Sequence, residues 1–394
     1  MIKRLFNRND NIAILIAGIF SIIIGLGVAR FAFTGLIPAM LDDYLTIKFV
    51  GILASLNFAG YLSGSIFSIF VKDINFKVYL YRFGIFLAIS TTFILAYSDN
   101  NTLWMVGRVL AGFAGAMCLI VGTSIVMQKL TIKSKTKAMG IHFSGIGFSI
   151  LTTDLLARFV LSLNYTWRDS WAVLAVFAII LSLYSVYILS FDKEVKQNAV
   201  KVKFDISIFT PFVIVLIIAY FTEGVGFVVQ ATFLPDIINN LKGLEGYGSL
   251  TWTLVGVAGI PSCIIWMLLA HRFGSSNIII IALLLQAVGI LIPAFSSNIY
   301  LNLLSGVLYG GTFIGLVALF MNLGGQLSRG NPVVLMGAMT SSYGIGQVIA
   351  PLYSVYFIEK YGNYDYALYF TAFIVLGGAV LLLLAKKFEP KDIE

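Results

Sequence analysis

Long runs of hydrophobic residues, interrupted by short polar segments, dominate the chain. Each of twelve runs has about 20 residues or more, the length that an α-helix needs to cross about 30 Å of hydrocarbon. The runs show no sustained alternation of hydrophobic and polar residues, which disfavours membrane β-strands. We therefore predict twelve transmembrane helices. They occupy approximately residues 12–40, 48–71, 78–98, 102–128, 138–163, 170–191, 207–235, 248–271, 277–296, 299–327, 333–358 and 365–386.

The composition supports lipid as the main solvent of the chain. Hydrophobic residues make up 59% of the sequence and charged residues 11%, whereas soluble proteins carry about 25% charged residues. The formal net charge is +8, but the cations lie mostly in the gaps between hydrophobic runs and form no basic stripe with interleaved aromatic residues. We therefore predict no nucleic-acid partner. The expected partners are membrane lipids and a small-molecule substrate.

The distribution of Lys and Arg predicts the orientation in the membrane, because cytoplasmic loops are enriched in these residues. With the N-terminus inside, the segments on the inner side hold nineteen Lys and Arg residues and those on the outer side hold four. This asymmetry predicts a multi-pass protein of the inner (plasma) membrane, with both termini cytoplasmic.

The two halves of the sequence resemble each other. Leu36-Ile37-Pro38 matches Phe233-Leu234-Pro235 at an offset of 197 residues, and Gly145-Ile146-Gly147 matches Gly344-Ile345-Gly346 at an offset of 199. A parallel duplication of this kind is typical of transporters built from two helical bundles. We predict an all-α integral membrane protein, monomeric, with two pseudo-symmetric six-helix bundles at 1–191 and 206–394 and a cytoplasmic linker at 192–205.

Five ionisable residues lie well inside predicted spans: Arg30, Arg108, Asp154, Arg158 and Glu223. Each unpaired charge at the centre of a span costs about 2.5–3.5 kcal/mol, so such residues are expected to be paired or to line a wet cavity. Asp154 and Arg158 are one helical turn apart, and Arg108 lies at a similar depth on the preceding span. We predict that Arg108 and Arg158 share Asp154. This cluster is either a structural clamp between adjacent helices or part of a gating network.

Arg30 and Glu223 are predicted to face one another near a central cavity, because Glu223 aligns with Leu26, one turn from Arg30, in the repeat. Arg30 offers a planar fork that suits a carboxylate or phosphate, and Glu223 in a low-dielectric site is expected to take up a proton. The alternative is a mutual structural ion pair. Further candidates for lining the cavity are Asn57, Gln230, Asn322, Gln326 and Gln347.

Several motifs resemble the major facilitator superfamily. Arg108-Val109-Leu110-Ala111-Gly112 is similar to its R-x-x-x-G motif, which implies a role for Arg108 in proton coupling. Ala270-His271-Arg272-Phe273-Gly274 is similar to its D-R-x-G turn, with His271 in the place of Asp. The segments GVARFAFTGLIPAM and GVGFVVQATFLPDI, in the first and seventh spans, resemble the YbfB/YjiJ-type branch. This resemblance implies that the first, fourth, seventh and tenth helices border the cavity.

The expected function is proton-coupled secondary transport of a small organic solute by alternating access, with an anion or related metabolite favoured as substrate. The alternative is a proton-driven exporter of drugs or amphiphilic metabolites. An enzyme is not expected, because the two histidines lie 129 positions apart and no zinc-type motif occurs. The chain also lacks a G-x-x-x-x-G-K-[ST] nucleotide motif. We therefore expect no cofactor and no metal, and the proton gradient as driving force.

Overall fold

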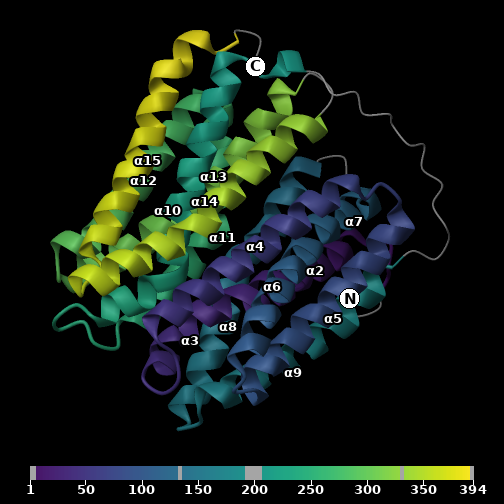
Figure 1. Cartoon of the computed structure of the whole chain (residues 1–394). Helices are drawn as coiled ribbons and strands as arrows, with labels where there is room; N and C mark the ends of the chain where they lie inside the picture. The colour runs from purple at the N-terminus through teal and green to yellow at the C-terminus, as the bar shows by residue number, and fades with distance from the viewer. Residues whose placement is uncertain (1–5, 132–134, 191–205, 329–331, 391–394) are drawn as a thin grey trace. The chain divides into compact units, whose positions relative to one another are not determined.

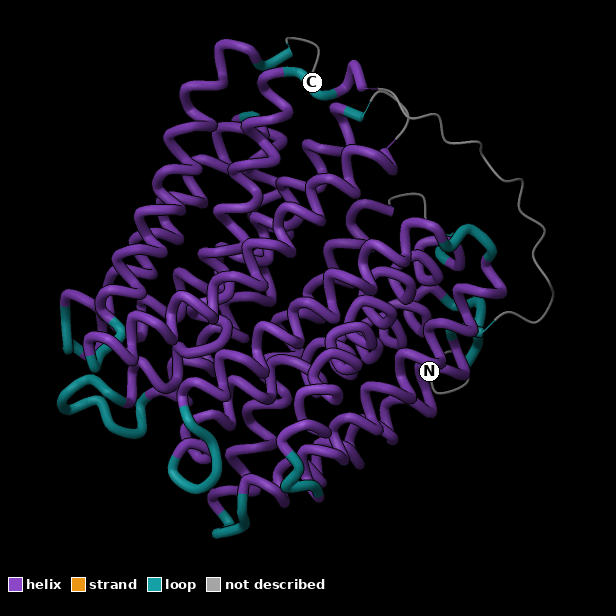
Figure 2. Tube along the Cα trace, viewed as in Figure 1, coloured by secondary structure: helices purple, strands orange, loops and turns teal. Residues whose placement is uncertain are grey.

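The computed structural model describes residues 6–131, 135–190, 206–328 and 332–390, and within these ranges the chain forms helices and connecting loops without strands (Figures 1 and 2). The helices of the first half are α2 (Asn11–Ile22), η1 (Ile23–Phe31), α3 (Ala32–Leu41), α4 (Ile47–Phe70), α5 (Ile74–Tyr97), α6 (Asn101–Ala116), η2 (Met117–Val121), α7 (Gly122–Lys129), α8 (Lys135–Ser162) and α9 (Trp167–Ile188). Those of the second half are η3 (Ile206–Ile208), α10 (Pro211–Asn239), α11 (Gly248–Phe273), α12 (Ser275–Phe295), α13 (Ile299–Leu327), α14 (Pro332–Tyr361), α15 (Asp365–Ala385) and η4 (Lys386–Phe388).

Eleven helices of the described chain are long and apolar enough to cross a membrane, which makes this a multi-pass membrane protein. Two of them are composite, because α2, η1 and α3 run on as Asn11–Leu41, and α6, η2 and α7 as Asn101–Lys129. The eleventh predicted span, 333–358, corresponds to α14, a helix of 30 residues that is not among these eleven membrane-crossing helices. Its passage across the membrane stays a prediction.

The chain divides into two compact units. One comprises residues 1–45 and 56–199, and the other residues 46–55 and 200–394. The first turns of α4 thus group with the second unit, although the helix continues into the first. The predicted linker, 192–205, lies outside the described residues. Pseudo-symmetry between two six-helix bundles stays a prediction.

The polar segments between the hydrophobic runs supply the caps that start the helices. Asn100 accepts a hydrogen bond from the Leu103 N–H at the start of α6. Thr166 and Asp169 form a capping box at the start of α9, in which each side chain binds the backbone of the other residue. Such caps satisfy N–H groups that have no partner within the helix, so short polar turns are enough to end one span and begin the next.

Small residues bring neighbouring helices into backbone contact within each unit. In the first unit a Cβ at Gly112 of α6 would lie 1.9 Å from the Asn57 carbonyl oxygen of α4. In the second unit a Cβ at Gly310 of α13 would lie 2.2 Å from the Val255 carbonyl oxygen of α11. Only glycine fits at these crossings. Helices in lipid associate largely through such close packing, because lipid gives no hydrophobic drive between them.

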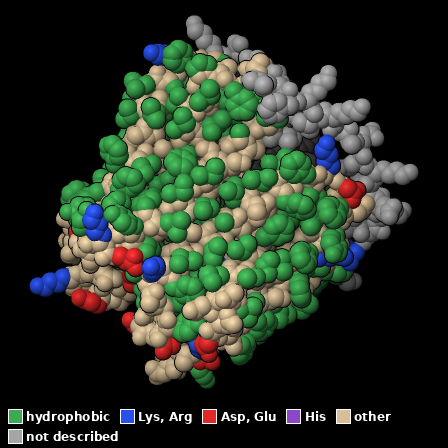
Figure 3. All heavy atoms as spheres, in the orientation of Figure 1, with side chains coloured by type: hydrophobic (Ala, Val, Ile, Leu, Met, Phe, Trp, Pro, Cys, Tyr) green, Lys and Arg blue, Asp and Glu red, His purple; other side chains and the backbone are tan. Residues whose placement is uncertain are grey.

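The outer surface of the helices is apolar. Hydrophobic side chains cover most of the face seen in Figure 3, and most of the visible Lys, Arg, Asp and Glu residues lie near its margins. Large hydrophobic side chains such as Phe70, Leu183 and Phe373 are 70–75% exposed. A surface of this kind is stable when lipid, rather than water, surrounds it.

Candidate functional site

Arg30 lies at the end of a π-helical segment in the first unit. The N–H of Ala32, just beyond η1, bonds to the carbonyl of Gly27, the i→i−5 spacing of a π-helix. Arg30 is 8% exposed. Its guanidinium carbon is 4.3 Å from the ring centre of Phe58 and 5.1 Å from that of Tyr61, both on α4. The aromatic faces attract the cation and hold it inside the helix bundle.

Arg108 of α6 lies next to this position. Its guanidinium donates a hydrogen bond to the Ala29 carbonyl in η1, 3.0 Å away, and its carbon is 4.3 Å from the ring centre of Phe33. Arg108 is 3% exposed, and Arg30 lies close enough for the two positive charges to repel each other. The first unit therefore holds two neighbouring buried guanidinium groups.

Asp154 and Arg158 pair along α8 as predicted, with a distance of 3.8 Å between Arg158 Nη1 and Asp154 Oδ2. The Asp154 side chain is 1% exposed and that of Arg158 is 40% exposed, so the pair extends from the interior to the surface. The prediction that Arg108 shares Asp154 is wrong, since no ion pair joins them in the described part of the unit. The Arg108 guanidinium instead binds the η1 backbone and the face of Phe33.

Glu223 lies inside the second unit, on α10, and is completely buried. Its carboxylate is beside the Gln286 amide of α12, but neither of its oxygens accepts a hydrogen bond of good geometry from the described residues. Gln286 is also fully buried. The sequence did not indicate Gln286 as the neighbour of Glu223. A buried carboxylate without a cation or hydrogen bonds is strongly disfavoured in its charged form.

Two aromatic residues of α10, Tyr220 and Phe227, lie one turn before and one turn after Glu223, and their rings belong to a larger cluster. Tyr220 stacks on Phe320 and on Tyr343, with 4.6 Å between ring centres in each case. Phe227 lies 5.1 Å from Phe313. The six rings of this aromatic cluster come from α10, α13 and α14, and all are buried. They are Tyr220, Phe227, Tyr309, Phe313, Phe320 and Tyr343. The spacing of Tyr220 and Phe227 around Glu223 is the sequence signal that could have identified this cluster.

The five polar candidates for lining a cavity occupy different environments. Asn57 is buried and its amide donates to the Arg108 carbonyl at 3.1 Å, which ties α4 to α6. Gln230 is buried and its amide donates to the Gly289 carbonyl and the Ser305 hydroxyl. Gln347 is buried, Asn322 is half-buried and Gln326 is exposed. The structure therefore gives Asn57 and Gln230 structural hydrogen bonds.

The predicted approach of Arg30 to Glu223 joins the two units, since Arg30 belongs to the first and Glu223 to the second. It stays a prediction. Within its own unit each residue has a distinct environment: Arg30 is beside a second guanidinium and aromatic rings, and Glu223 is beside an amide and aromatic rings.

The comparison with protein families agrees with the membrane-spanning helical architecture. A family model described as "Uncharacterised MFS-type transporter YbfB" matches residues 22–383, which is most of the chain. No curated protein matches the chain. Because the match extends from the first predicted span into the last, the chain belongs to the YbfB-like family of major facilitator superfamily transporters.

Proposed function

We propose that the protein is a secondary active transporter that moves a small organic anion across the inner (plasma) membrane by alternating access, coupled to the proton gradient. Membership of the transporter family supports the mode of action. Transporters of this type bind substrate near the bilayer midplane and expose the site alternately to each side. The choice of substrate class and coupling ion rests on the buried charges.

The neighbouring guanidinium groups of Arg30 and Arg108 are the observation that carries the choice of an anion. With the buried Asp154 carboxylate they leave one positive charge in excess in the interior of the first unit. A charge in the membrane interior costs about 2.5–3.5 kcal/mol, and an anionic substrate that reaches the guanidinium groups offsets this cost. The planar fork of Arg suits carboxylates and phosphates in particular.

Glu223 is the proposed proton carrier. It is fully buried beside Gln286, an environment that favours the neutral acid, whereas contact with water favours the carboxylate. A carboxyl group that changes between these environments during the transport cycle takes up a proton on one side of the membrane and releases it on the other. This mechanism requires that Glu223 become accessible to water in another state of the transporter.

The first experiment identifies the ligand class. A thermal-unfolding screen of the purified protein against metabolite anions and cations measures stabilisation, because a ligand that binds the folded state raises its stability. We expect anions to stabilise the protein and Arg30→Gln to remove this effect. Arg272→Gln, which removes an exposed Arg at the end of α11, is the matched control and should retain it. Stabilisation by cations alone would overturn the assignment of an anion.

The second experiment tests proton coupling with the anion found. Uptake into proteoliposomes is measured with and without an imposed pH gradient, for the wild type, for Glu223→Gln and for Glu359→Gln, an exposed control on α14. We expect the gradient to drive uptake in the wild type and the control, and to have no effect in Glu223→Gln. A pH-gradient response that survives in Glu223→Gln removes this residue from the coupling mechanism.

A drug or amphiphile exporter is the second candidate, and the aromatic cluster beside Glu223 favours it. Rings on either side of a carboxylate suit a lipophilic cation, which binds aromatic faces as well as the negative charge. Transport of fluorescent lipophilic cations out of cells, and into inverted vesicles, separates the two functions. Glu223→Gln should abolish this export, whereas an anion transporter gives none in either preparation.

A further inference from the structure

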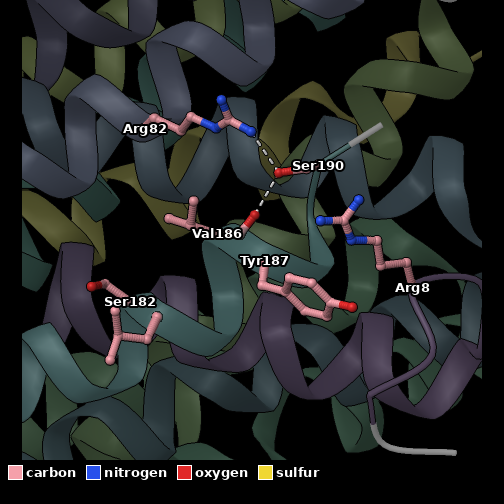
Figure 4. A pocket seen from close by; sticks show the side chains of 7 residues that line it. Arg8, Arg82, Ser182, Val186, Tyr187 and Ser190 are labelled. Atoms are coloured by element: carbon pink, nitrogen blue, oxygen red, sulfur yellow. Dashed lines mark hydrogen bonds between the residues drawn. The ribbon is translucent and has the colours of Figure 1, made fainter. Parts of the chain in front are cut away.

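A cavity of about 370 Å³ lies at one end of the first unit, away from the buried charges described above. Its lining comes from Arg8 in the segment before α2, from Arg82 of α5, from the last turns of α9 and from Ser190 just beyond α9. Figure 4 shows Arg8 and Arg82 pointing toward Ser190 from two directions. Arg82 Nη2 donates to the Ser190 hydroxyl at 2.7 Å, and the Arg8 guanidinium carbon is 4.3 Å from the ring centre of Tyr187.

The charges around this cavity are predominantly positive. Lys129, at the end of α7, donates to the Ser190 carbonyl at 2.5 Å and adds a third cation to Arg8 and Arg82. Among the described residues of this end, two carboxylates each hold the first turn of a helix. Asp10 accepts from the Ile12 N–H of α2, and Asp73 accepts from the Phe76 N–H of α5. Each carboxylate therefore has one oxygen bound to a helix N-terminus.

Next to the cavity, α9 has an exposed apolar face. Ile180, Leu183 and Tyr187 recur at intervals of three and four residues, which places them on one face of the helix. Leu183 is 70% exposed, and Leu183 and Tyr187 also line the cavity. Because α9 is one of the membrane-crossing helices, this exposed face meets acyl chains.

The cavity also lies at the depth of lipid headgroups. The chain enters α2 at Asn11 and leaves α9 at Ile188, so both boundaries of the spans are beside it. Guanidinium groups bind phosphate through parallel hydrogen bonds. Basic pockets between transmembrane helices at the end of the spans are suited to anionic headgroups.

We propose that this cavity binds an acidic phospholipid, with the headgroup phosphate held by Arg8 and Arg82 and one acyl chain lying along Ile180, Leu183 and Tyr187. Free phosphate offers the same kind of anionic oxygens but has no chain to cover the apolar face of α9. The arrangement therefore selects a lipid. Its occupation ties the segment before α2 to α5 and α9, and so stabilises the first unit independently of the transported solute.

The test uses the purified full-length protein in detergent. Thermal unfolding is followed during titration with phosphatidylglycerol, with phosphatidylcholine of the same acyl chains, and with inorganic phosphate. Native mass spectrometry counts the lipids retained. We expect phosphatidylglycerol alone to raise the unfolding midpoint. The double substitution Arg8→Gln/Arg82→Gln should weaken its binding by about fivefold for each Arg, on the order of thirtyfold together.

Two further variants make the result decisive. The double variant Lys242→Gln/Arg272→Gln removes the same charge from exposed positions of the second unit and should bind phosphatidylglycerol like the wild type. Leu183→Glu places a negative charge at an exposed side chain of the cavity wall and should abolish binding without disturbing the core. Equal responses to both lipids, an equal response to inorganic phosphate, or full retention of phosphatidylglycerol by Leu183→Glu would each overturn the proposal.

Discussion

Replacing Gly310 with Ala tests how closely α11 and α13 pack in the second unit. The added Cβ would lie 2.2 Å from the Val255 carbonyl oxygen and 2.7 Å from the Val255 Cα. Both atoms belong to the backbone of α11 and cannot turn aside as a side chain can. The adjacent residue provides a matched control, because a Cβ at Gly311 meets nothing within 4 Å.

The expected cost follows from this geometry. To restore an ordinary contact of about 3.4 Å, the two helices must separate locally by roughly 1.2 Å. A gap of 0.5–1 Å already forfeits about a quarter to a half of the attraction between packed atoms, and insertion of a methyl group into a packed core typically costs about 1–3 kcal/mol. Both substitutions gain similar helix propensity. The difference in stability between Gly310→Ala and Gly311→Ala therefore measures only the close contact between α11 and α13.

The assay is thermal unfolding of both variants in the same detergent. We expect Gly310→Ala to unfold several degrees below Gly311→Ala, at about 2–4 °C per kcal/mol. Unfolding midpoints that agree to within about 1 °C would refute the packing argument. In the first unit Gly112→Ala, whose Cβ would lie 1.9 Å from the Asn57 carbonyl oxygen, should be destabilised relative to Gly107→Ala, whose nearest contact is 3.7 Å away.

Two other predictions concern polar contacts. Burial and the neighbouring Asp236 carboxylate raise the pKa of the Tyr364 phenol well above its usual value. The protonated phenol therefore contributes fully to the stability of the folded protein below about pH 10, and this contribution is lost as the pH rises through the folded-state pKa. Tyr364→Phe should lower the free energy of unfolding by about 1.5–3 kcal/mol at neutral pH and flatten the alkaline part of the stability profile; an unchanged profile would contradict this. Arg158→Gln should cost under about 1 kcal/mol, because its side chain is 40% exposed, whereas Asp154→Asn should cost more because the Asp154 side chain is only 1% exposed. Chemical or thermal unfolding compares the two, and equal losses would argue against this ranking.

The sequence predicted the spans well because hydrophobicity decides which segments enter lipid. The first predicted span, 12–40, is the composite helix Asn11–Leu41, and the gap between the predicted spans 78–98 and 102–128 contains Asn100, the cap of α6. The eleventh predicted span, 333–358, shows the limit of this signal. Its segment, α14, is helical, but its many Gly, Ser, Thr and Tyr residues reduce the hydrophobic contrast that identifies a membrane-crossing helix.

The partners of the buried charges were harder to predict, because they depend on which face of each helix points where. Depth along the spans suggested that Arg108 binds Asp154, but the Arg108 guanidinium reaches the Ala29 carbonyl. A backbone acceptor leaves no signature in the sequence. Glu223 was correctly placed among residues within a span, but the neighbouring amide of Gln286 comes from α12, which is not among the helices that were expected to border the cavity.

The π-helical turns of η1 contain more residues than α-helical turns, so the first helix has an extra residue that the α-helix α10 does not have. A surplus residue in a turn can pass to the next turn by exchanging one i→i+5 bond for an i→i+4 bond, without stretching the helix. Each such exchange swings the residue that it passes by roughly 100°, the rotation per residue at 3.6 residues per turn. Arg30 stands at the border of this segment. Its guanidinium can therefore rotate about the helix axis while both ends of the span keep their positions.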